Sequence, residues 1–213
     1  NTLVETDARL QIVPSLARAW KISPDRLRVS FYLRTDVFFH DDPAFKGGKG
    51  RKLVAADVVY SFRRLMSPSV ASPGAWIFNH RVDPLNGFEA ENDSVLHINL
   101  LKPFVQILGV LSNVYCSVVP KEAVEYYGAS FRTHPVGTGP FRLKVWEEGQ
   151  ALILHRNANY FETDEQGNRL PYLPGIKVSF LDSKAAEFLA FRQAQLDFIN
   201  DIDPSFKDEV LNK

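Results

Sequence analysis

The stretch LRVSFYLR at residues 27–34 alternates apolar and polar side chains, which is the two-residue period of a strand with one buried face. Residues 96–100, LHINL, repeat this alternation. Between these strands, residues 58–66 carry Val, Phe, Leu and Met at the spacing of one helical face, and Pro68 marks the end of that helix. The first 118 residues are therefore predicted to form hairpins with helices laid on one face.

The rest of the chain is predicted to alternate short helices and strands. A helix begins at Pro103, because proline is tolerated at the first helical position. The further predicted elements are a helix at 121–127 that ends at Gly128, a hairpin of 141–146 and 151–156, a strand at 176–180, a helix capped by Asp182 and Ser183, and a strand at 196–199. The last strand, helix and strand are compatible with a parallel crossover, so the fold class is mixed α/β, or α+β.

The composition excludes several classes of partner. The 213 residues contain 25 Lys and Arg against 25 Asp and Glu, so the chain has no general attraction to nucleic acid or to an anionic membrane. One cysteine, Cys116, cannot form an internal disulfide or a structural zinc site. The apolar runs are shorter than a membrane span and no export signal precedes Asn1, so the protein is expected either to be cytosolic or to have lost such a signal. Because residues 206–213 are predicted as a helix cut off without a cap, we expect a fragment of a longer chain.

Residues that could carry chemistry also have structural interpretations. Residues 47–52 are rich in glycine and cations but lack the Lys-Ser/Thr ending of a nucleotide loop, so a solvated hairpin loop is favoured. The histidines are scattered without ligand spacing, and His97 lies in a strand pattern, where a hydrogen-bonded sheet position is expected. Residues 40–42, His-Asp-Asp, could coordinate a hard cation, but a turn is favoured. Cys116 lies in an apolar run, which favours a buried thiol over a nucleophile.

Trp76 is less easily explained by packing. It follows residues 72–74, Ser-Pro-Gly, in a predicted loop. A large indole in such a place either covers a small core or forms a stacking wall of a binding cleft, and the sequence leaves both open.

Seven short motifs occur in order along nearly the whole chain, and together they resemble the family 5 extracellular solute-binding proteins. The motifs are P-x-L-A-x-x-W at 14–20, F-x-L-R-x-x-V-x-F-H-D at 31–41, L-x-A-x-D-V-x-Y-S at 53–61, K-P at 102–103, V-P-K at 119–121, G-T-G-P-F at 137–141 and R-N-x-x-Y at 156–160. The chain departs from the family pattern at four places: Val54 replaces a capping Thr, residues 42–51 form an insertion, Phe161 replaces Trp, and no Gly precedes Asp197. These departures affect local caps and turns and leave the order intact.

The resemblance implies an incomplete lobe of the periplasmic-binding-protein type with an inserted accessory α+β subdomain. By this comparison, residues 1–118 are the accessory subdomain and residues 119–213 are part of the first lobe of a two-lobed clamp, with the second lobe absent. The family function is peptide capture outside the cytoplasmic membrane and delivery to the permease of an ABC importer. The resemblance thus implies a monomer that lies in the periplasm or outside the cytoplasmic membrane and has no cofactor and no enzymatic activity. Some members of the family are attached to the membrane by a lipid anchor, through an N-terminal segment that this chain would have lost.

Four residues are candidates for the ligand site. The loop around Gly74 and Trp76, and the segment containing Asn113 and Tyr115, resemble stretches that face the crevice between the lobes in peptide-binding members. Such sites bind peptide main chain through hydrogen bonds and leave side chains in roomy pockets. Two alternatives stay open: a non-peptide cargo such as nickel, haem or an oligosaccharide, and an enzyme built on the same fold, which would show a nucleophile with a base, or three metal ligands, on one surface.

Overall fold

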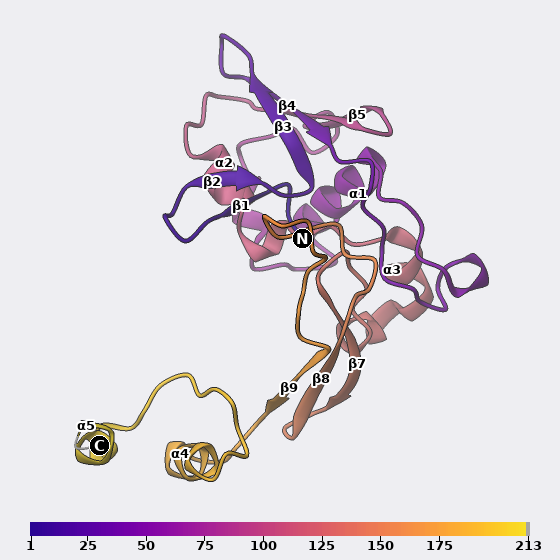
Figure 1. The fold of residues 1–213 in the computed structure, drawn as a ribbon. Coiled ribbons are helices and arrows are strands. Elements are labelled where there is room, and N and C mark those ends of the chain that lie inside the picture. Colours follow the sequence, from indigo (N-terminus) through magenta and orange to yellow (C-terminus); the bar gives the residue numbers. More distant parts are fainter. Residues whose placement is uncertain (212–213) are drawn as a thin grey trace. The chain divides into compact units, whose positions relative to one another are not determined.

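Strand β4 (Arg28–Leu33) lies inside a four-stranded antiparallel sheet in the order β3 (Ala17–Ile22), β4, β6 (Val95–Asn99) and β5 (Phe88–Asn92) (Figure 1). Val29, Phe31 and Leu33 are buried and alternate with partly exposed residues, which confirms the predicted two-residue period. Phe31 pairs with Leu96 of β6, so the apolar residues of both strands lie on one face of the sheet.

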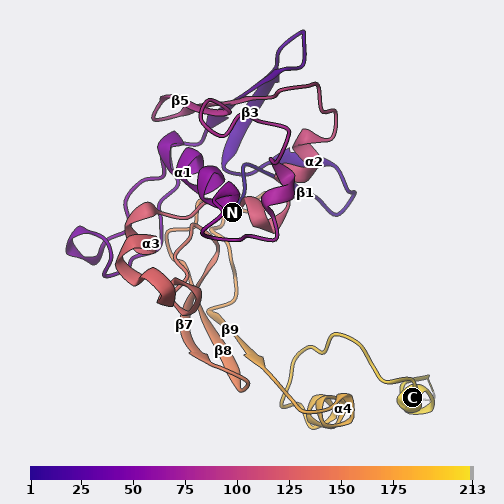
Figure 2. The same cartoon turned by 180° about the vertical axis from the view of Figure 1, so that it is seen from behind.

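Helix α1 (Ala55–Met66) packs against this buried face beside β5 and β6 (Figure 2). The ring of Phe62 on α1 lies 4.8 Å from that of Phe78 and 5.4 Å from that of Phe88, and the rings of Phe78 and Phe88 are 4.9 Å apart. Each such aromatic pair contributes about 0.5–1.5 kcal/mol beyond the burial of its surface. The helix is thus held to the edge of the sheet by a cluster of three rings.

The structure describes residues 1–211, which divide into two units. The first unit comprises residues 1–143 and 155–174, and the second comprises residues 144–154 and the chain from 175 onward. The remaining strands are β1 (Val4–Thr6), β2 (Ile12–Pro14), β7 (Phe141–Glu147), β8 (Ala151–Arg156) and β9 (Gly175–Ser179), and the remaining helices are α2 (Ile107–Leu111), α3 (Lys121–Tyr127), α4 (Lys184–Arg192) and α5 (Lys207–Leu211). The boundary between subdomain and lobe after residue 118 refers to the whole protein and stays a prediction.

A network of charges joins the start of α1 to α3. The guanidinium of Arg51 donates to both carboxylate oxygens of Asp57, at 2.8 and 2.7 Å, and to both of Glu122, at 2.6 and 2.8 Å. Asp57 also accepts a 2.9 Å hydrogen bond from the backbone N–H of Val54, the residue before α1. Because the Asp57 side chain is only 4% exposed, these donors replace the hydrogen bonds that water would otherwise give its oxygens.

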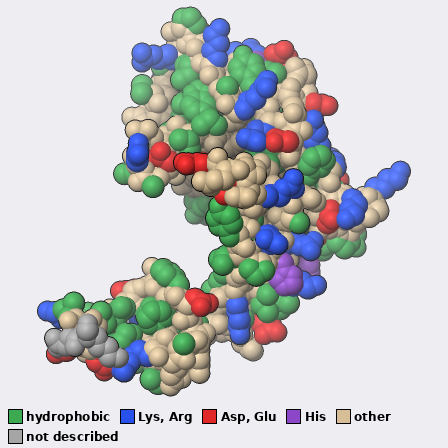
Figure 3. Space-filling view, in the orientation of Figure 1, with side chains coloured by type: hydrophobic (Ala, Val, Ile, Leu, Met, Phe, Trp, Pro, Cys, Tyr) green, Lys and Arg blue, Asp and Glu red, His purple; other side chains and the backbone are tan. Residues whose placement is uncertain are grey.

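The second unit contains β9, α4, α5 and most of the hairpin of β7 and β8. In the sheet of three strands, β8 lies between β7 and β9, and Ser183 caps α4 by accepting from the backbone N–H of Ala186, as predicted. Within the described part of this unit, only Ala151 and Phe188 are buried. Hydrophobic side chains therefore lie at its surface (Figure 3).

Two predicted elements are wrong. Residues 196–199 do not form a strand, and Phe198 is 77% exposed, because an alternating pattern becomes a strand only where another strand edge pairs with it. The helix expected from Pro103 begins at Ile107, after a turn. Among residues 1–211, the structure contains no helix of the length and apolar character needed to span a lipid bilayer.

Candidate functional site

Two short helical turns in the first unit carry the predicted site residues. Trp76 lies in the turn Ala75–Ile77 and Tyr115 in the turn Val114–Cys116. Gly74, directly before the first turn, lies against Tyr115: a Cβ atom on Gly74 would be 2.5 Å from the Tyr115 Cβ. That approach is closer than carbon atoms allow, so glycine is required at position 74 for the two turns to meet.

Trp76 is held by its neighbours and leaves its indole in solvent. Ile77 and Phe78 are fully buried, while Trp76 is 48% exposed. The Arg81 guanidinium donates a 2.5 Å hydrogen bond to the Trp76 carbonyl and lies 6.0 Å from its ring and 4.5 Å from the ring of Phe104. Arg81 is therefore a cation beside an exposed aromatic surface, which the sequence did not reveal because its contacts depend on the folded loop.

Tyr115 and Asn113 are fixed by the second turn. The Asn113 side-chain oxygen accepts a 3.0 Å hydrogen bond from the backbone N–H of Tyr115, so Asn113 caps this turn. Tyr115 is 43% exposed, whereas Cys116 next to it is fully buried. Burial raises the pKa of the Cys116 thiol to about 12, so the thiol stays protonated and anchors the turn, as the sequence favoured.

The arrangement offers two aromatic surfaces on fixed backbone with a guanidinium nearby. We call Gly74, Trp76, Arg81, Asn113 and Tyr115 the aromatic surface. The rings of Trp76 and Tyr115 both lie outside the buried core. Such a surface can stack against planar or apolar groups and can hydrogen bond to carbonyl or carboxylate groups through Arg81 and the tyrosine hydroxyl. Whether the aromatic surface faces a ligand stays a prediction.

A hydrogen-bonded Ser, His and Glu lie on the polar face of the four-stranded sheet. The hydroxyl of Ser30 is 2.8 Å from Nδ1 of His97, and Nε2 of His97 is 2.7 Å from Glu91. A serine hydrolase also needs backbone N–H groups aimed at a developing oxyanion, but Ser30 lies mid-strand between paired Lys21 and His97. The histidine holds the sheet position that the sequence predicted for it.

The acidic residues after His40 serve local structure. Asp41 accepts hydrogen bonds from Lys49 at 2.7 Å and from the backbone N–H of Gly50 at 3.0 Å. Asp42 accepts from the backbone N–H of Ala44 and from the hydroxyl of Tyr127. The favoured turn is thus confirmed, and among residues 1–211 no three His, Cys, Asp or Glu side chains gather in a group able to hold a metal ion.

Comparison with known proteins gives one consistent family. The model of the bacterial extracellular solute-binding proteins, family 5, matches residues 11–213. The probable di/tripeptide-binding protein 5 of Pseudomonas aeruginosa is 34% identical over 182 residues, which are 76% of this chain and 33% of that protein. The heme-binding protein A of Haemophilus influenzae is 30% identical over 175 residues, which are 76% of this chain and 32% of that protein. The chain thus spans about a third of the length of these curated relatives.

Similar solved structures are also binding proteins. The periplasmic binding protein DppA of Helicobacter pylori, in complex with the peptide STSA, has a TM-score of 0.86 and 27% identity, and the match covers 100% of this chain and 43% of that chain. A binding protein of Agrobacterium tumefaciens in complex with mannopinic acid has a TM-score of 0.78 and 30% identity, with 92% and 37% covered. NikZ of Campylobacter jejuni, in complex with nickel and L-histidine, has a TM-score of 0.80 and 25% identity, with 100% and 39% covered. The predicted fold class is therefore confirmed.

Proposed function

The chain belongs to the family 5 bacterial extracellular solute-binding proteins, and from this premise we propose that the whole protein captures peptides outside the cytoplasmic membrane and delivers them to the permease of an ABC importer. The observation that carries the proposal is the family match over residues 11–213 together with 34% identity to a probable di/tripeptide-binding protein. The protein acts as a monomer without catalysis and does not bind nucleic acid. A lipid anchor, where present, holds it at the membrane.

The aromatic surface is proposed to form part of one wall of the peptide crevice. Trp76 and Tyr115 supply stacking surfaces at 48% and 43% exposure, and Gly74 lets their turns meet. Asn113 fixes the backbone beside Tyr115, and Arg81 places a cation next to the indole. Aromatic walls accept varied side chains, because stacking and apolar contact do not depend on one hydrogen-bond pattern.

The test is native mass spectrometry of the full-length protein as purified, followed by calorimetry with the peptides it releases. A ladder of peptide masses is expected. Trp76→Ala and Tyr115→Ala are each expected to weaken peptide binding at least about fivefold, since a stacked aromatic contact is worth about 1 kcal/mol. Tyr126→Ala, which removes a 62% exposed tyrosine elsewhere in the first unit, is the matched control and is expected to leave affinity unchanged.

A second cargo class has specific support. The 30% identity to a heme-binding protein is close to the 34% identity to the peptide-binding relative, and NikZ binds a nickel–histidine complex on the same fold. In the same experiment, a single haem or metal mass in place of the peptide ladder would reject the peptide proposal and favour this class.

A further inference from the structure

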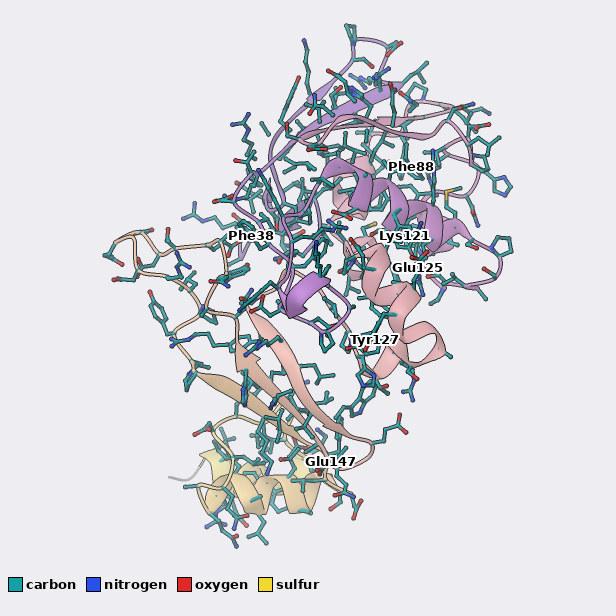
Figure 4. All side chains as sticks on the ribbon, turned by 90° about the vertical axis from the view of Figure 1, so that its right-hand side faces the viewer. Phe38, Phe88, Lys121, Glu125, Tyr127 and Glu147 are labelled. Atoms are coloured by element: carbon teal, nitrogen blue, oxygen red, sulfur yellow. The ribbon has the colours of Figure 1, made fainter. Side chains whose placement is uncertain are left out.

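A groove follows the solvent side of α1 in the first unit. Its volume is about 1060 Å³. Tyr60, Arg63 and Arg64 of α1 line one side, and residues 88–90 of β5 line the other, with Leu85 before them. None of the residues of the aromatic surface lines it. Figure 4 looks onto this region, with Phe88 beside α1 and with Lys121 and Glu125 on the neighbouring α3.

The charges in the groove are unbalanced. Arg63 donates to the carbonyls of Leu85 and Phe88, at 2.9 and 3.4 Å, and Arg64 lies 5.9 Å from the ring of Phe131. Within residues 1–211, neither guanidinium forms an ion pair with a carboxylate.

The nearby acids are already paired with other cations. Glu89 is 2.9 Å from Arg28, and Glu125 is 3.4 Å from Lys121. The groove therefore presents two positive charges that an anionic partner can complement.

The sheet side of the groove is an edge strand, on which Arg63 reaches the carbonyl of Phe88 and Ala90 lies beyond that contact. Strand β5 is the last strand of its sheet and pairs only with β6. The backbone N–H of Asn99 donates to the carbonyl of Gly87, so by the alternation of an antiparallel ladder the backbone groups of Phe88 and Ala90 point away from β6. Three consecutive residues of β5 line the groove, which shows that it runs along this edge.

We infer that the groove binds an extended, acidic segment of a partner polypeptide. An extended chain can pair with the β5 edge at Ala90, and its carboxylates can reach Arg63 and Arg64 across the groove. Aliphatic residues between the carboxylates contact Val59, Val70 and Leu85, which also line it. This site is separate from the proposed peptide crevice and does not depend on the cargo that the crevice takes.

The test uses the full-length protein and a fluorescein-labelled probe, the acetylated and amidated peptide Leu-Glu-Val-Glu-Leu-Glu-Val, with a photo-crosslinking residue at its centre. Anisotropy measures affinity, and mass spectrometry of the crosslinked protein locates the peptide. Crosslinks are expected within residues 56–70 and 85–90, and the affinity is expected to fall as salt is raised. A probe with Lys in place of each Glu is expected not to bind.

Variants assign the binding to the two arginines. Arg63→Gln combined with Arg64→Gln is expected to lower the affinity for the acidic probe about tenfold or more, because hydrogen bonds between charged groups are lost. Arg9→Gln with Arg18→Gln removes the same charge from exposed positions outside the groove and is the matched control. Ala56→Glu keeps both arginines and adds a carboxylate at an exposed position that lines the groove, so it is also expected to weaken the probe.

Four results would overturn the inference. The first is that the full-length protein does not bind the acidic probe, and the second is that the crosslinks map to Trp76 and Tyr115 instead of the groove. The third is that the Lys probe binds as tightly as the acidic probe. The fourth is that the protein binds anionic phosphatidylglycerol vesicles but not the peptide, and that the two arginine replacements abolish vesicle binding. Failure of the crevice proposal would instead appear as loss of the peptide ladder with the groove crosslinks retained.

Discussion

Helices α1 and α4 lie in different units and reach their helical state by different means. In α1, seven of the twelve residues are buried, and Val54 before it has no side-chain atom that can accept a hydrogen bond. In α4, one of nine residues is buried, and the Ser183 hydroxyl caps the first turn. The residue before the buried helix α1 therefore provides no capping side chain, whereas the residue before the exposed helix α4 does.

Capping and burial are two separate contributions to the stability of a helix. A cap contributes about 1 kcal/mol, whereas burying a phenylalanine or leucine side chain contributes about 1.5–3 kcal/mol. Helix α1 therefore depends on the sheet under it, and α4 depends on its cap and on one buried side chain, Phe188, whose ring lies 4.4 Å from that of Phe206.

The largest effect is expected from the ring cluster. Phe62→Ala removes a side chain that is 1% exposed and touches two other buried rings, so it is expected to destabilise the first unit by about 3–5 kcal/mol. Urea unfolding followed by tryptophan fluorescence measures this in a Trp146→Phe background, because Trp20, which is partly buried against the same core, and Trp76 both lie in the first unit.

The matched change in the other helix is Leu189→Ala. Leu189 is 55% exposed, and its loss is expected to change stability by less than about 0.5 kcal/mol. If the two substitutions had similar effects, the contrast between a packed and a locally stabilised helix would be incorrect.

The next effect concerns the charge network under α1. Arg51→Met leaves the buried Asp57 carboxylate without its cation, and a loss of about 2 kcal/mol is expected. This expected loss of stability is smaller than for a fully buried ion pair, because the Arg51 side chain is 36% exposed. Lys49→Met removes an 80% exposed lysine paired with Asp41 in the same loop, and this control is expected to have almost no effect.

The same network predicts a loss of stability in acid. The hydrogen bonds from Arg51 hold the pKa of Glu122 below its ordinary value, so near that pH the folded state binds fewer protons than the unfolded state. The stabilisation is complete above about pH 4.3, the ordinary Glu pKa, and is lost as the pH falls through the lower pKa of the folded state.

The expected acid effect is at most about 1 kcal/mol, because the Glu122 side chain is 39% exposed. The urea midpoint at pH 7 and at pH 3.5 measures it in the wild type and in Arg51→Met. In Arg51→Met, the part of the acid destabilisation that comes from Glu122 is expected to disappear. If the variant lost as much stability between pH 7 and pH 3.5 as the wild type, the pair of Arg51 and Glu122 would not be its cause.

Part of the fold could be predicted from the sequence because short-range patterns determine it. The alternation at 27–34 and the helical face at 58–66 each bury one side, so their periods are visible in the sequence. Strand β5 was missed, since four of its five residues are exposed and only Phe88 marks the core. The residues at 196–199 have a suitable pattern, but they pair with no strand in the described part of the chain, although β9 is an edge strand of the same unit.

The candidate site was predictable only in part. The resemblance placed Gly74, Trp76, Asn113 and Tyr115 on two segments, and the structure shows Gly74 against Tyr115. Arg81 was not predicted, because its contacts with Trp76 and Phe104 form only when the loop after α1 folds back. Sequence spacing does not report such long-range contacts.

The smallest effect is expected from exchanging the caps. Val54→Thr supplies α1 with the side-chain acceptor that it lacks and is expected to stabilise the first unit by about 0.5 kcal/mol. The gain is below that of an ordinary cap because Asp57 already binds the backbone N–H of Val54. Ser183→Ala, which removes the cap of α4, is expected to increase hydrogen exchange in residues 184–192 without moving the urea midpoint of the first unit, measured in the same Trp146→Phe background. If Ser183→Ala moved that midpoint as far as Phe62→Ala, then α4 would contribute to the packed core, and local capping would not explain how it stays helical.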